Sequence, residues 1–129
     1  MSFDIFLTSF QNSEVNPLPR SIVLAALSPI ASRCESGYWR FTDSVATIDI
    51  PDEGPISGLT INRPPGYPEF WQAIVDILSK TPSVLYWGIG AVVADRAVIA
   101  HLPRSFVEKL GMPTVTSDVT EILNLIRDS

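Results

Sequence analysis

The stretch INRPPGYPEFWQAIVDIL, residues Ile61–Leu78, places three prolines and a glycine immediately before an aromatic pair and an apolar run. Pro64 and Pro65 have no N–H to donate to a β-ladder, so they end a strand. Pro68 and Glu69 supply a proline suited to the first helical turn and an acid matched to the helix dipole. The stretch therefore predicts a strand that ends at residue 61 and a helix that begins at residue 68.

The predicted helix is amphipathic. Its apolar stripe consists of Phe70, Ile74, Ile77 and Leu78 with Trp71 at the edge, and its polar face is marked by Gln72, Asp76 and Lys80 at spacings of four. This is the periodicity of a helix that buries one side. We expect it to be the strongest helix of the chain.

Strand and helix patterns also alternate on both sides of this helix. Strands are predicted at residues 3–10, 38–41, 45–50, 56–61, 83–87 and 91–95, and helices at residues 19–27, at 104–111 and after Asp118. The first strand has no clean polar side, which predicts a central strand covered on both faces. The order contains a βαββαβ pattern. It predicts an α+β fold with a mainly antiparallel sheet and helices packed on it, as a ferredoxin-like core plus C-terminal helices.

The composition is that of one globular domain, residues 1–129. Hydrophobic residues make up 46% and charged residues 18%, which is enough apolar material for a folded core. The 9 basic and 14 acidic side chains give a net charge of −5, the wrong sign for binding a nucleic-acid backbone. A single cysteine, no basic leader region and no apolar run of about 18 residues predict a cytoplasmic protein without a membrane span.

No residue pattern in the sequence predicts catalysis, a cofactor or a metal. GIGAVVAD, residues Gly88–Asp95, lacks the third glycine of a dinucleotide-binding loop and leads into a strand pattern. The only histidine, His101, and the only cysteine, Cys34, are too few for a zinc site, and ASRCESG around Cys34 contains no nucleophile motif. A G-x-S-x-G elbow is missing as well. We therefore expect a protein that is not an enzyme.

Two sets of side chains are candidates for contact with a partner protein. The acidic set is Asp43, Asp49, Asp52 and Glu53, on the predicted hairpin and its exit, and the aromatic set is Trp39 and Tyr67. A negative ridge suits Lys and Arg on another protein, whereas the same charges also guard a solvated edge strand that has no partner. Aromatic residues dominate interface hot spots but are equally typical of the core and of sheet cover.

The segments MSFDIFL, INRPPGYPEFW and PSVLYW, followed by VVAD and HLP, together resemble a group of small bacterial proteins over most of the chain. Some of that group are similar to the cytoplasmic immunity proteins of contact-dependent inhibition and other polymorphic toxin systems. The resemblance implies a non-enzymatic protein that binds a cognate, basic toxin domain and blocks its active site. It assigns no role to any single residue.

The sequence also supports a hypothesis of a different class. A small-ligand-binding or enzymatic domain would use an aromatic cleft near Arg63, Tyr67 and Trp87, where a basic side chain lies among aromatic ones. Whether copies of the chain associate is left open by the sequence.

Overall fold

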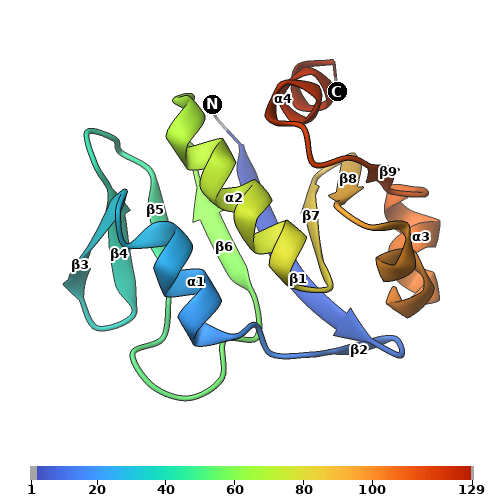
Figure 1. Cartoon of the computed structure of the whole chain (residues 1–129), viewed down its shortest axis with the longest axis horizontal. Helices are drawn as coiled ribbons and strands as arrows, with labels where there is room; N and C mark the ends of the chain where they lie inside the picture. The colour runs from blue at the N-terminus through green and yellow to red at the C-terminus, as the bar shows by residue number, and fades with distance from the viewer. Residues whose placement is uncertain (1–2, 129) are drawn as a thin grey trace.

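The computed structural model describes residues 3–128, which form an α+β fold with a nine-stranded, mostly antiparallel mixed sheet and five helices (Figure 1). The strands are β1 (Asp4–Gln11), β2 (Glu14–Val15), β3 (Ala31–Glu35), β4 (Tyr38–Phe41), β5 (Thr47–Asp49), β6 (Leu59–Asn62), β7 (Ser83–Trp87), β8 (Gly90–Val93) and β9 (Thr114–Val115). The helices are α1 (Arg20–Leu27), α2 (Pro68–Lys80), the 3-10 helix η1 (Arg96–His101), α3 (Arg104–Leu110) and α4 (Val119–Arg127). None of the helices in this part of the chain has the length and hydrophobicity that crossing a bilayer requires.

The sheet has β1 near its centre. Its strand order is β3-β4-β5-β6-β1-β7-β8-β9, and β2 pairs with the end of β1. Among the described residues, neighbouring strands run antiparallel except β8 and β9, which are parallel. Helices α1 and α2 pack together across one face of the sheet, and α4 packs against α2 and β8 (Figure 1). The three helices therefore cover the same face.

Helix α2 confirms the prediction made from the proline-rich stretch. It begins at Pro68, carries Glu69 in its first turn and Lys80 in its last, and buries its apolar stripe. Trp71 is fully buried, and its Nε1 donates to the carbonyl oxygen of Pro65 at 3.0 Å. The proline segment thus fixes the start of the helix as well as ending the strand before it.

Strand β1 is covered on both faces, as its apolar pattern predicts. Ile5 and Leu7 belong to the main core under the helices. Phe10 belongs to a smaller core built from β1, β7, β8 and η1. Phe6 stacks on Tyr86 with ring centroids 5.2 Å apart. Because side chains alternate along a strand, the two cores lie on opposite faces of the β1-β7-β8 part of the sheet.

The predicted hairpin at residues 38–50 forms, with a second strand shorter than expected. Strand β4 has the predicted bounds, whereas β5 covers only Thr47–Asp49. Ala46 and Ile48 are fully buried, and Val45 is 67% exposed. The predicted alternation of a polar and an apolar face is therefore confirmed.

Strand β3 is the longest strand that the sequence pattern does not predict, and the two-residue β2 is another. Only Ala31 is buried, and the other four residues are exposed. The strand pairs with β4, and a bulge interrupts the register between Arg33 and Glu35. Such a polar edge strand shows no apolar alternation from which it could be predicted. Only its backbone pairing with β4 defines it as a strand.

Two further boundaries differ from the prediction by more than one residue. Strand β6 begins at Leu59, not at residue 56, because Ile56 forms an isolated bridge with Leu18 instead. A Cβ on Gly58 would lie 3.2 Å from the carbonyl oxygen of Leu7, so the chain passes close to β1 at that point. Strand β8 ends at Val93, and the residues after it form η1, which the sequence pattern does not predict.

The α+β class and the mainly antiparallel sheet are confirmed. Strands β5, β6, β1 and β7 are neighbours in that order, and α1 and α2 pack over them. However, β3 and β4 stand between α1 and β5 along the chain, which an uninterrupted βαββαβ unit does not contain. The ferredoxin-like core stays a prediction.

Candidate partner-binding surface

The four predicted acids lie along the β4–β5 hairpin and the loop after it, and all are exposed. Asp43 is in the turn between β4 and β5, with a φ of 53°, a left-handed conformation that Asp tolerates better than most residues. Asp49 is at the other end of β5, paired with Tyr38. Asp52 and Glu53 follow in the loop. Asp43 thus lies at the turn of the hairpin and the other three acids lie at or beyond its far end, and we call the four together the acidic row.

Asp52 differs from the rest of the acidic row because Arg33 binds it. Nε and Nη2 of Arg33 donate to the two carboxylate oxygens of Asp52, each at 2.8 Å. This bonding to Arg33, followed by a hydrogen bond with Ser36, holds the pKa of Asp52 well below its ordinary value. Asp52 in turn raises the pKa of Arg33, chiefly through the same hydrogen bond. The charge of Asp52 is therefore compensated inside the molecule.

We expect Asp52→Asn to loosen the loop against β3 without unfolding the protein. The loop is tied to the β3–β4 turn through the N–H of Ile50, which donates to the carbonyl oxygen of Gly37 at 3.1 Å. Hydrogen exchange of the Ile50 amide should become several-fold faster, because the loop opens locally more often. The protein should stay folded, because the Arg33–Asp52 pair is exposed and contributes little to global stability. Glu53→Gln, one residue away, is the control and should leave that exchange rate unchanged.

The pH dependence of hydrogen-exchange protection at the Ile50 amide follows from the lowered pKa of Asp52. A depressed carboxyl pKa contributes stability that is fully present above the unfolded value, roughly 3.9, and is lost as the pH falls toward the folded value. Protection of the Ile50 amide, after correction for intrinsic exchange, should stay constant from about pH 5 to 8 and decrease only below about pH 4. A decrease near neutral pH would contradict this assignment.

Asp43 and Tyr67 border one hollow of about 260 Å³, together with Glu69. Tyr67 precedes the first residue of α2 and is half-buried. Its hydroxyl oxygen is buried and has no hydrogen-bond partner among residues 3–128. Burial raises the pKa of Tyr67, and the negative charges of Glu69 and Asp43 raise it further. The phenol therefore stays protonated at neutral pH as a hydrogen-bond donor beside two carboxylates.

Trp39, the other predicted aromatic contact, lies on the side of β4 that faces the helices. It is paired with Ile48 on one neighbouring strand and with Arg33 on the other. Its half-buried ring packs against the main core. Trp39 thus covers the sheet, and its neighbour on the adjacent strand β3 is Arg33.

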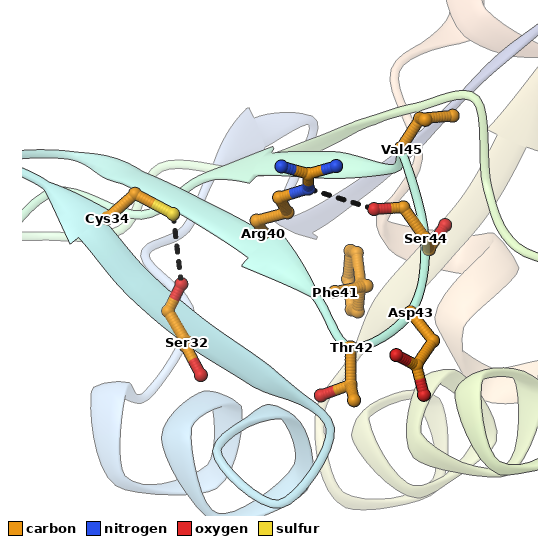
Figure 2. A pocket seen from close by; sticks show the side chains of 8 residues that line it. All are labelled: Ser32, Cys34, Arg40, Phe41, Thr42, Asp43, Ser44 and Val45. Atoms are coloured by element: carbon orange, nitrogen blue, oxygen red, sulfur yellow. Dashed lines mark hydrogen bonds between the residues drawn. The ribbon is translucent and has the colours of Figure 1, made fainter.

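A wider hollow of about 620 Å³ lies on the β3–β4 hairpin and the β4–β5 turn (Figure 2). Figure 2 shows Arg40 extending toward the turn, where its Nε donates to the carbonyl oxygen of Ser44 at 2.9 Å. Cys34 is exposed on the same hollow, with its Sγ 3.7 Å from the carbonyl oxygen of Ser32. Asp43 borders this hollow as well as the one at Tyr67. The sequence does not indicate this wider hollow, because one of its walls is the unpredicted strand β3.

The aromatic cleft predicted from Arg63, Tyr67 and Trp87 is divided in the structure. Tyr67 borders the hollow beside Asp43, whereas Trp87 borders another one beside Phe6. Arg63 lines neither of the two, and is exposed in a left-handed conformation with a φ of 53°. A ligand at Tyr67 and a ligand at Trp87 would therefore occupy separate places.

Within residues 3–128, no group of three or more His, Cys, Asp or Glu side chains is placed to hold a metal ion. Comparisons with models of protein families, with curated proteins and with solved structures find no match to this chain.

Proposed function

We propose that this protein is an immunity-type inhibitor, which binds a cognate basic toxin domain non-covalently and blocks its active site. One observation carries the proposal: three exposed carboxylates of the acidic row, Asp43, Asp49 and Glu53, form no ion pair within the described part of the chain. Exposed charges without an internal partner are available to Lys and Arg on another protein. Such an inhibitor acts where its toxin acts, and we propose the cytoplasm as that place.

The distribution of charge along the chain supports the same proposal. Residues 31–76 contain seven acidic and three basic side chains, so they hold four of the five net negative charges. This segment includes β3 to β6 and most of α2, the half of the sheet that bears the acidic row. A field concentrated on one part of a protein steers a partner of opposite charge and accelerates association.

Tyr67 is the aromatic residue best placed to anchor such a contact. It lies beside Asp43 and Glu69, and tyrosine is enriched among the residues that dominate binding energy. In this proposal the acidic row sets the association rate, and Tyr67 contributes to the lifetime of the complex.

The test is the association rate of the purified protein with the product of the gene immediately upstream, which the proposal expects to be the toxin, measured by stopped-flow fluorescence at two salt concentrations. Asp49→Lys with Glu53→Lys should lower the rate constant by at least roughly tenfold at low salt, because steering contributes about ten- to a thousandfold. The difference from wild type should shrink at high salt, where surface charges are screened. Asp52 stays unaltered because it is bonded to Arg33.

The matched control reverses two exposed acids that lie outside the acidic row, Glu14 in β2 and Asp128 after α4. Glu14→Lys with Asp128→Lys changes the net charge by the same amount and should reduce the rate much less. Equal losses in the two double variants would show that only net charge matters. Unchanged binding in the Asp49/Glu53 variant would eliminate the acidic row as the contact face.

For the fold, we propose that β5-β6-β1-β7 with α1 and α2 is a ferredoxin-like unit into which the β3–β4 hairpin is inserted. The neighbour order of the four strands and the packing of the two helices support this. In this description the insertion carries Arg33, the residue that compensates Asp52.

A further inference from the structure

Aromatic side chains from three elements surround a hollow at the end of β7. Phe6 of β1, Tyr86 of β7 and Phe106 of α3 border it, together with Trp87 and Gly88. Its volume is about 270 Å³, close to the lower end of the range for small-molecule sites. None of its lining residues belongs to β3–β6 or the loops between them. The hollow is therefore distinct from the acidic row.

The rings of this hollow hold one another in place. Phe6 and Tyr86 stack at 5.2 Å between centroids, and Phe106 meets Tyr86 edge-on at 5.1 Å and 86°. The hydroxyl of Tyr86 lies 3.3 Å from the hydroxyl of Thr8, which fixes the ring further. All three rings are only half-buried. The aromatic walls are thus pre-formed and still accessible, which reduces the ordering cost of binding a planar molecule.

Lys109 is the charged residue among those that line this hollow. It is exposed and lies in the last turn of α3. The adjacent Glu108 pairs with Arg104, with 3.2 Å between Oε1 and Nε, and not with Lys109. Lys109 itself forms no ion pair within the residues described. The rim of an aromatic hollow therefore carries one positive charge without an internal partner.

We propose that this hollow binds a small aromatic carboxylate, with the ring among Phe6, Tyr86 and Phe106 and the carboxylate on Lys109. Aromatic rings pack favourably face to edge or offset at such distances. An ammonium–carboxylate hydrogen bond is stronger than a neutral one and selects a charged ligand over its amide. A ligand with one ring and one negative charge matches the small volume of the hollow and its single cation, Lys109. This inference goes beyond the proposed function and does not depend on it.

The test is an amide-shift titration of the isotope-labelled protein with 3-phenylpropanoate and, separately, with neutral 3-phenylpropanamide. The carboxylate should cause saturable shifts at Gly88, Phe106 and Lys109. The amide should bind at those same residues about tenfold more weakly, because it cannot make the charged contact. No saturation up to roughly 10 mM carboxylate, or saturable shifts elsewhere in the protein, would overturn the proposal.

Two variants separate the charge from the rings. Lys109→Gln should reduce the affinity for the carboxylate to that for the amide and leave binding of the amide unchanged. Phe106→Leu should weaken both ligands, since it removes a ring and keeps an apolar side chain. Lys80→Gln, an exposed lysine at the end of α2, is the matched control and should change neither affinity. A carboxylate preference that survives in Lys109→Gln would refute the site as proposed.

Discussion

Replacing Trp71 with alanine is expected to lower the free energy of unfolding by about 3–5 kcal/mol, the range for removing a large buried aromatic side chain. Trp71 is fully buried, and its ring meets that of Phe70 edge-on at 5.0 Å. The substitution also deprives the Pro65 carbonyl of the indole N–H. Domains of this size are stable by roughly 5–15 kcal/mol, so this one side chain accounts for a large share. Equilibrium urea unfolding followed by circular dichroism measures the loss.

Two further tryptophan variants show what causes that loss. Trp71→Phe keeps a ring and removes the N–H donor, so its effect should be intermediate. Trp39→Ala removes a ring that is only half-buried, and should cost roughly half as much as Trp71→Ala or less. Equal costs at the two positions would mean that α2 is not packed on the sheet as described.

The second large effect has the opposite sign: Tyr67→Phe should raise the free energy of unfolding by about 1–2 kcal/mol. The hydroxyl of Tyr67 is buried and has no hydrogen-bond partner within residues 3–128. Leaving a buried polar group unsatisfied costs about 1–3 kcal/mol, and phenylalanine removes that cost while keeping the ring. The same urea titration detects the gain as a higher midpoint with an unchanged slope.

Tyr86→Phe is the matched control for this variant. The hydroxyl of Tyr86 has a partner in Thr8, so its removal should be neutral or destabilising. A loss of stability in Tyr67→Phe would show that the Tyr67 hydroxyl is satisfied after all. If Tyr67 anchors a toxin, the more stable variant should also release the toxin faster, a trade of stability for function that is common at binding sites.

Strong local patterns made much of the fold predictable. The apolar stripe and proline start of α2, and the alternation around β5, both follow from residues that are neighbours in sequence. Strand β3 could not be predicted in this way, because four of its five residues are exposed and only its backbone pairing with β4 defines it as a strand. The start of β6 at Leu59 could not be predicted either, because only the structure reveals the close passage of the Leu7 carbonyl at Gly58.

The candidate site likewise has features that the sequence indicates and features that only the structure shows. Exposure of the acidic row follows from its turn and hairpin positions, which the sequence indicates. The bonding of Asp52 to Arg33 was hidden because Arg33 lies on the unpredicted β3. The approach of Asp43 to Tyr67 joins residues 24 positions apart, and no local pattern carries such information. The ring-walled hollow likewise requires α3 to lie against β1 and β7.

The bulge in β3 makes that edge of the sheet a poor template for pairing with a second copy of the protein. A straight edge strand offers a continuous row of N–H and C=O groups that another copy can extend, whereas the register break between Arg33 and Glu35 interrupts that row. The opposite edge, β9, is only two residues long. Neither end of the sheet therefore provides a good template for adding strands. If the protein is the inhibitor that we propose, it has to be kept in excess of its target, and sheet edges that resist self-association would permit such accumulation without aggregation.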